Sequence, residues 1–346
     1  MKITIIWRYL VGIDVSKNLL DIYLLDRKTG MGHECQVSNN PKGFARLARW
    51  LAEHEAEKSQ TKLISEHTGR YGEHLLRWTT DNDWTHAVVK TTALKNLRGE
   101  HPRKTDAFDA TDLAEYGERF SDRLWLAEAP KPAVGQIKRL QAERRAMVDR
   151  RAALKAKLTE ADIHDAHMEP IIRMWDEQVA QLTEHIEELE ERITQQISPD
   201  PVLSRRYQTM RSAPGMGKVL TPLWVSLFAG QQSLDGRQIA ARFGHAPKPY
   251  RSGTSVRKPD RSAGFGNSEV RKVLHQAALS VKRNYPHYQE YYNRKKAEGK
   301  DHLLIINNII NKLIRLYCAM WNNRSEYDPN HIPKMEKKYG KSAEKA

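Results

Sequence analysis

The sequence predicts an α/β domain at the N-terminus, then a pair of long helices, then a basic and mostly α-helical domain. Three observations lead to this prediction. Up to about residue 129, β-rich runs alternate with amphipathic helical patterns. Between about residues 133 and 198 the composition changes to Arg, Glu, Gln and Ala. The whole basic excess of the chain lies after residue 202.

The first 129 residues contain an ordered series of β and α patterns. Strands are expected at residues 3–16, 18–26 and 33–39, with a turn at residues 30–32. A helix at 41–57 places Phe44, Leu47, Trp50 and Leu51 on one face. A strand at 62–67, a helix through Leu75, a strand at 86–91 and a helix from residue 105 follow. This order is that of a ribonuclease H-like α/β domain.

Residues 130–201 are predicted to form a helical coiled-coil linker. Pro130 and Pro132 mark its start. The second helix carries apolar residues at alternating steps of three and four, which is a coiled-coil seam: Val179, Leu182, Ile186, Leu189 and Ile193. The first helix keeps most of this register, with Arg144 and Arg151 at seam positions. Loss of the seam around residues 161–170 indicates an antiparallel hairpin, which can pair within one chain or between subunits.

Residues 202–326 form the third predicted domain, and its charge indicates a polyanionic partner. From residue 203 to the end there are 27 Lys and Arg against 10 Asp and Glu, and residues 1–202 are slightly acidic. Lys and Arg release counterions from phosphates, so this imbalance favours nucleic acid. Simple solubility is the alternative. The lysine-rich residues 327–346 are expected to be a basic, disordered tail.

Two short segments of the basic domain stand out. The turn at residues 213–217 contains Gly215 and Gly217, followed by Lys218, and is similar to a helix-hairpin-helix that grips phosphate. An ordinary turn remains the alternative. Residues 247–267 are predicted to be a Gly- and Ser-rich basic loop, with two more helices after it that end near Asn323.

Composition also bears on the compartment. Cys35 and Cys318 are too few for a disulfide framework or a zinc site, which fits a reducing environment. The N-terminal segment lacks a small-residue cleavage site. The apolar stretch 303–321 is interrupted by Asn and basic residues and is predicted to be a core helix. We therefore expect a cytoplasmic, nucleoid-associated protein with no membrane partner.

Four carboxylates occupy positions that suit a metal site. Asp14 and Glu66 each end an apolar strand, and parallel pairing of these strands would bring them side by side. Asp106 and Asp109 are three residues apart at a helix start and share one face. Each can be explained without a metal: the helix pair as a favourable first turn, and Glu66 as a strand-end acid. Asp112 is expected to be solvated.

Taken together, the four acids favour a divalent cation. Converging carboxylates repel one another unless a cation neutralises them. Mg²⁺ (or Mn²⁺) takes oxygen ligands, and a pair of such ions can activate the attacking and leaving oxygens of a phosphodiester. The sequence therefore predicts a magnesium-dependent site that acts on nucleic acid.

Several segments resemble one protein family. GIDVSK at 12–17, SEHTGRYG at 65–72 and RKTDAFDATDLA at 103–114 resemble the DEDD transposases of the IS one-ten insertion-sequence family. In the second half, APGMGKVLTPLWVSLFAG, RQIAARFGHAPKPYRSG and FGNSEVRKVLHQAA resemble its C-terminal transposase domain. One departure is Phe265 before Gly266, where the family commonly has a basic residue.

The resemblance implies a RuvC-like catalytic domain, a coiled coil and a C-terminal domain with a serine nucleophile. Asp14, Glu66, Asp106 and Asp109 would be the metal-binding acids, and Ser252 the nucleophile. The resemblance also implies recombination of donor and target DNA directed by a structured noncoding guide RNA. A homo-oligomer, dimer or tetramer, is the expected assembly.

Without the family resemblance, Ser252 is one of several serines in its loop that could be the nucleophile. Basic neighbours that could hold a phosphate surround it: Arg251, Arg257, Lys258 and Arg261. Because no His stands near it in sequence, we expect the metal-bound acids to activate its hydroxyl, with the two domains coming from different subunits. The expected function is a DNA transposase that forms a covalent phosphoserine link.

Two rival functions remain. A RuvC-like junction resolvase would need the acids and water but not Ser252, and a non-catalytic nucleic-acid-binding scaffold would need neither. An actin-like sugar kinase also starts with a GIDVS-type strand, but the chain lacks the further Gly-rich phosphate loops of that fold.

Overall fold

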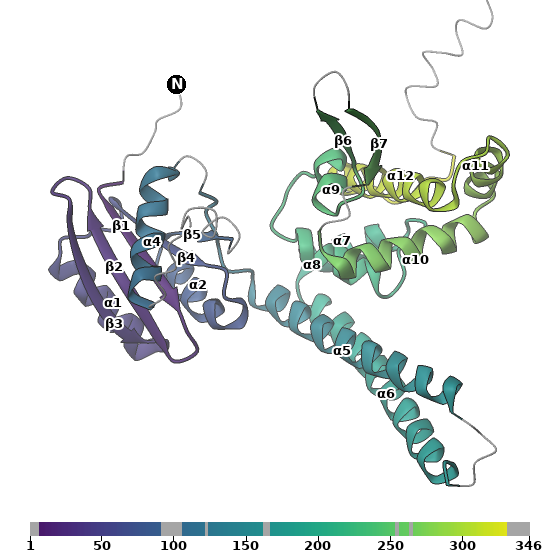
Figure 1. Cartoon of the computed structure of the whole chain (residues 1–346), viewed down its shortest axis with the longest axis horizontal. Helices are drawn as coiled ribbons and strands as arrows, with labels where there is room; N and C mark the ends of the chain where they lie inside the picture. The colour runs from purple at the N-terminus through teal and green to yellow at the C-terminus, as the bar shows by residue number, and fades with distance from the viewer. Residues whose placement is uncertain are drawn as a thin grey trace, which may run out of the picture. The chain divides into compact units, whose positions relative to one another are not determined.

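The computed structural model of the chain separates into two compact units, residues 1–130 and 131–346 (Figure 1). It describes residues 7–90, 106–121, 124–161, 167–252, 256–262 and 266–330; the side chains of residues 106–108, 247–252 and 256–262 are outside the description.

Five described strands of the first unit form one mixed sheet in the order β3-β2-β1-β4-β5. β1 (Tyr9–Val15), β2 (Leu19–Asp26) and β3 (Met31–Ser38) pair antiparallel as a meander. β4 (Thr61–Glu66) and β5 (Thr85–Val89) continue the sheet in parallel on the other side of β1. This mixed sheet with its helices fits a ribonuclease H-like domain, as the order of sequence patterns predicted.

Helices cover both faces of the sheet (Figure 1). α1 (Pro41–Glu53) and α2 (Gly72–Asp81), the latter preceded by the short 3₁₀ turn η1 (Gly69–Tyr71), lie on one face. Their apolar residues pack against alternate strand residues; the core on this side includes Val11, Ile13, Leu47 and Leu75. α4 (Asp106–Arg119) covers the opposite face, where Leu113 packs with Leu10, Ile64 and Val89.

The second unit begins with an antiparallel hairpin of two 29-residue helices, α5 (Pro132–Glu160) and α6 (Glu169–Ile197). The two seam arginines have polar partners across the hairpin: Arg144 donates to Glu190 and Arg151 to Thr183. The seam that the sequence predicted therefore packs within one chain. Whether it also pairs with a second subunit stays a prediction.

Within the described residues, six further helices build the core after the hairpin. They are α7 (Pro201–Arg211), α8 (Leu220–Phe228), α9 (Gly236–Arg242), α10 (Ser268–Asn284), α11 (Pro286–Ala297) and α12 (His302–Asn323). Trp224, Phe228, Tyr317 and Trp321 form a fully buried aromatic cluster at its centre. α12 is the described helix that is long and apolar enough to span a membrane, and half of its apolar window is buried in this core.

Three details of the second unit differ from the sequence prediction. Residues 247–262 were expected to be a loop but contain a β-hairpin, β6 (Pro247–Ser252) and β7 (Val256–Ser262). Two helices were expected near the end, but Pro286 starts a third, because proline fits the first turn of a helix and not its interior. The tail was expected from residue 327, yet the amide of Tyr327 donates to Ser212 Oγ at 2.9 Å; residues 331–346 lie outside the described part.

Candidate active site

Asp14 and Glu66 stand side by side at the carboxyl ends of two parallel strands. The register of β1 and β4 pairs Ile13 with Ser65, so the next residues along the strands are Asp14 and Glu66. Both are half-buried. Side chains alternate along a strand, which puts Asp14 on the same face as Leu10, and Glu66 on that of Ile64. Both acids thus belong to the face that α4 covers.

α4 lies directly on β1 because residue 12 is a glycine. A Cβ atom at Gly12 would stand 1.9 Å from the carbonyl oxygen of Ala110 and 2.8 Å from the amide nitrogen of Ala114. Further along the helix, Gly117 lies beside Ile64 and Leu10. The helix therefore runs antiparallel to β1, and its N-terminal turn is directed toward the end of the strand that carries Asp14.

The acids of α4 lie at this N-terminal turn. Asp106 is the first residue of the helix, but its side chain is outside the description. Asp109 is half-buried and immediately precedes Ala110, which touches Gly12. Asp112, expected to be solvated, is half-buried because the helix packs closely on the sheet. The backbone thus gathers the ends of β1 and β4 and the start of α4 in one region.

The donor set fits a hard divalent cation. Asp14, Glu66 and Asp109 offer carboxylate oxygens only, the ligands that Mg²⁺ prefers. Among the residues that the structure describes, no three acidic, His or Cys side chains lie close enough together to hold a metal ion. The placement of the acids therefore comes from the strand register and from the α4–β1 contact rather than from contacts among the carboxylates.

A third strand adds a carboxylate that the sequence analysis did not consider. Asp21 on β2 is the register partner of Asp14, and its carboxylate accepts a hydrogen bond from Gln36 Nε2 at 2.7 Å. Paired residues of neighbouring strands point to the same face, so Asp21, Asp14 and Glu66 form a row across three strands. The length of the turn between β1 and β2 sets this register, so the turn length is the sequence feature that could have predicted the pairing of Asp14 with Asp21.

A buried histidine fixes the strand just before Glu66. His86 on β5 is 2% exposed, and its Nε2 lies 2.9 Å from Ser65 Oγ while its Nδ1 lies 3.0 Å from Thr79 Oγ1. Burial lowers the pKa of His86 to about 4, so the ring is neutral at pH 7. Its position, on the face opposite α4, makes it a structural support of β4.

Ser252 is the last residue of β6, paired with Val256 across the tip of the β-hairpin. Arg251 is paired with Arg257, and Lys258 and Arg261 lie on β7. The hairpin therefore brings the predicted nucleophile and its basic neighbours onto one short ribbon. Their side chains are outside the description.

The turn between α7 and α8 is anchored in the core. Gly215 has φ +78°, a left-handed conformation that favours glycine, and Tyr317 Oη donates to the carbonyl of Pro214 at 2.7 Å. Gly217 and Lys218 are exposed, and Lys218 Nζ lies 2.7 Å from Glu190 Oε2 on α6. The phosphate contact expected of this turn stays a prediction, and Lys218 already has an ion-pair partner.

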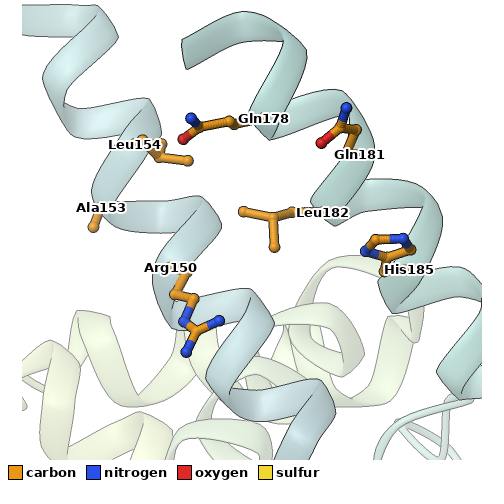
Figure 2. Close-up of a pocket in the computed structure, with 7 residues that line it drawn as sticks. All are labelled: Arg150, Ala153, Leu154, Gln178, Gln181, Leu182 and His185. Atoms are coloured by element: carbon orange, nitrogen blue, oxygen red, sulfur yellow. The ribbon is translucent and has the colours of Figure 1, made fainter. Parts of the chain in front are cut away.

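A shallow hollow of about 480 Å³ lies on the α5–α6 hairpin (Figure 2). Figure 2 shows Leu154 and Leu182 facing each other across it, with Gln178 and His185 on α6 at its rim. These are seam and flanking positions of the hairpin. The hollow therefore reflects a loosely packed section of the seam and contains none of the predicted site residues.

Comparisons with known proteins match both halves of the chain. A family model for DEDD transposases of the IS110 type, described as "Transposase", matches residues 11–161. A second, described as "Transposase IS116/IS110/IS902 family", matches residues 207–293. The first match contains Asp14, Glu66, Asp106 and Asp109, and the second contains Ser252.

Full-length relatives are also found. A "Pilin gene-inverting protein" of Moraxella bovis is 27% identical over 331 residues, covering 92% of this chain and 97% of the relative. Its counterpart in Moraxella lacunata matches to the same extent. "Insertion element IS110 uncharacterized 43.6 kDa protein" of Streptomyces coelicolor (strain ATCC BAA-471 / A3(2) / M145) is 26% identical over 120 residues, 34% of this chain and 29% of that protein.

Among solved structures, "T. thermophilus RuvC in complex with Holliday junction substrate" is similar at 15% identity and a TM-score of 0.25, over 34% of this chain and 99% of that one. The family assignment rests on the two models, which together span both units and agree with the full-length relatives. The chain belongs to the IS110 family of insertion-sequence transposases.

Proposed function

We propose that this transposase cuts and rejoins DNA through a covalent phosphoserine intermediate at Ser252, with Asp14, Glu66, Asp106 and Asp109 as the acids that hold Mg²⁺ or Mn²⁺. The observation that carries the proposal is the alignment of Asp14 with Glu66 beneath the N-terminal turn of α4. An oxygen-only donor set at this place suits phosphodiester chemistry. When bound, the metal supplies Lewis acidity to a phosphate oxygen.

The chain's own residues perform the transfer in this proposal. Ser252 Oγ attacks the phosphorus, its bond to phosphorus forms as the bond to the leaving deoxyribose oxygen breaks, and the serine proton passes to a carboxylate of the acidic set. The leaving oxygen takes a proton from water. Because one phosphodiester replaces another, the reversed step can seal a new strand without ATP. Arg251 and Arg257 would stabilise charge on the phosphate.

Two partners are part of the proposal. Donor and target DNA follow from the family, and the basic second unit supplies the positive charge that phosphates attract. A structured guide RNA from the element and a dimer or tetramer that combines units of different subunits rest on the family resemblance. A protein that acts on DNA in this way works in the cytoplasm at the nucleoid, where the free thiols of Cys35 and Cys318 fit the reducing conditions.

The proposal is tested by comparing wild type, Ser252→Ala and Asp14→Asn in a plasmid recombination assay with Mg²⁺, alongside DNA binding measured by gel shift. We expect both variants to bind DNA and to lose recombination. Wild type, quenched with denaturant, should yield a protein–DNA adduct that Ser252→Ala does not form.

Two results would favour the rival functions. Strand cleavage that persists in Ser252→Ala, with no adduct in wild type, would identify a resolvase that uses water. Binding without any cleavage by wild type would identify a scaffold.

A further inference from the structure

The β6–β7 ribbon, which carries Ser252, is held at its base by three polar side chains. We define the ribbon clamp as His245, which lies just before β6, together with Asn307 and Asn311 on α12. His245 is 5% exposed, and both asparagines are half-buried. The clamp therefore belongs to the interior of the second unit.

The asparagines bind both the backbone and the ring of His245. Asn307 Nδ2 and Asn311 Nδ2 each donate to the carbonyl oxygen of His245 at 3.1 Å, so both acceptor sites of that oxygen are used. Because a carbonyl only accepts, this bond fixes the orientation of the Asn307 amide, and its Oδ1 lies 2.8 Å from His245 Nδ1. Burial lowers the pKa of His245, so the ring is neutral at pH 7. Its single proton is therefore on Nδ1.

Both sides of the ribbon base meet the C-terminal end of α9. Gly244 follows this helix with a left-handed φ of +73°, and the amide of His245 donates to the carbonyl of Ala240 at 2.8 Å. On the return side Gly266 has φ +115°, and a Cβ atom there would lie 2.8 Å from the carbonyl oxygen of Arg242. The base of the ribbon is thus fixed to α9 and, through the clamp, to α12.

The ribbon projects beyond α9 and α12, so Ser252 lies at the far end of a lever (Figure 1). From Ala246 to Ser252 the strand spans about 20 Å, at about 3.3 Å per residue. His245 is therefore too far from Ser252 to take its proton. A tilt of about 10° at the base, however, would move the tip by about 3 Å over this length. Because a misplacement of about 1 Å can lower a rate about 100-fold, the angle of the ribbon matters for the transfer step.

We propose that His245, Asn307 and Asn311 are positioning residues, which hold the ribbon at the angle that brings Ser252 Oγ to the scissile phosphate. They act through the backbone of the ribbon rather than by contact with the DNA. The inference rests on the proposed function, because it takes Ser252 as the nucleophile. Loss of the clamp should slow the transfer step much more than it weakens DNA binding, since basic residues occur throughout the second unit.

The test measures the single-turnover rate of protein–DNA adduct formation at saturating DNA with Mg²⁺, together with the affinity for the same DNA. His245→Ala and Asn307→Ala should lower the rate by roughly 100-fold and change the affinity by less than about threefold. His245→Asn should stay within about threefold of the wild-type rate, because its amide places an N–H where the Nδ1–H of the histidine lies. The amide of His245→Gln reaches the position of Nε2 instead, so this variant should be slow. If an alanine variant melts below the assay temperature, the comparison of His245→Asn with His245→Gln decides.

The matched control is Asn322→Ala, on the same helix. Asn322 also binds backbone through its amide: Oδ1 accepts from the amide of Leu234 at 2.8 Å, and Nδ2 donates to the carbonyl of Leu234 at 3.0 Å. Leu234 precedes α9, at the end of that helix remote from the ribbon, so this variant should keep the wild-type rate.

Three results would overturn the proposal: equal losses of rate in Asn307→Ala and Asn322→Ala, equal rates in His245→Asn and His245→Gln, or a loss of affinity that accounts for the whole defect. A failure of the proposed function has a different signature. In that case wild type forms no adduct, or Ser252→Ala still forms one.

Discussion

Acidification should destabilise the first unit through His86. The imidazole is buried between Ser65 and Thr79, with a pKa of about 4 in the folded chain against about 6.5 in an unfolded one. The unfolded state therefore binds more protons between these two values, and the stability contributed by the neutral ring is fully present above pH 6.5. That contribution is lost as the pH falls from 6.5 toward 4.

The size of the effect follows from the gap between the two pKa values. The full gap of about 2.5 pH units corresponds to about 3 kcal/mol, of which about 2 kcal/mol is lost between pH 7 and pH 5. Because Ser65 directly precedes Glu66, we expect the carboxyl end of β4 to loosen before the rest of the sheet.

Urea unfolding at pH 7 and pH 5, followed by covalent footprinting and mass spectrometry, measures this directly. Peptides of β4 and β5 then report on the first unit alone. His86→Gln should be less stable at pH 7 but lose about 2 kcal/mol less than wild type on acidification. His74→Gln, at an exposed position of α2, is the control and should follow wild type. Parallel pH dependences of wild type and His86→Gln would refute the assignment.

Three further substitutions test the packing of α4 on β1, the charge of the row of acids, and the ion pair inside the α5–α6 hairpin. Gly12→Ala should displace α4 from β1, lower the free energy of unfolding by about 1–3 kcal/mol and abolish cleavage. Gly135→Ala in α5, where a Cβ atom would meet nothing within 4 Å, is the control and should retain activity. Thermal melting and a cleavage assay measure both effects. Asp21→Asn should raise the Mg²⁺ concentration for half-maximal cleavage by roughly threefold, because one negative charge leaves the row of acids. Arg144→Met should cost about 2 kcal/mol in urea unfolding, since it leaves Glu190 with one cationic partner.

Much of the first unit was predictable because its signals are local. β-rich runs, amphipathic helices and their order predicted the mixed sheet, and the end of an apolar strand marked Asp14 and Glu66. Parallel neighbours align their carboxyl ends, so the proximity of these two acids followed from topology alone. Asp21 was missed because an antiparallel register depends on the exact length of a turn, which hydrophobic patterns do not encode.

The second unit was harder to predict where apolar periodicity is weak. The β6–β7 ribbon has prolines at 247, 249 and 259 and no continuous apolar face, so nothing in its pattern distinguishes it from a loop. Its register shifts between Lys248 and Tyr250, which further blurs alternation. In the sequence Arg144 and Arg151 interrupt the apolar seam, but each has a polar partner on the facing helix, and hydrophobic periodicity does not predict such a pairing.

The unequal charge of the two units indicates how binding and chemistry divide between them. Residues 1–130 carry no net charge, with 19 Lys and Arg against 19 Asp and Glu, and a row of carboxylates at the end of the sheet repels phosphates unless cations neutralise it. Attraction of DNA must then come from the second unit, which carries the basic excess of the chain. Chelation of Mg²⁺ should therefore abolish cleavage while leaving duplex affinity nearly unchanged. A collapse of affinity on chelation would mean instead that the acidic site is itself the main anchor for DNA.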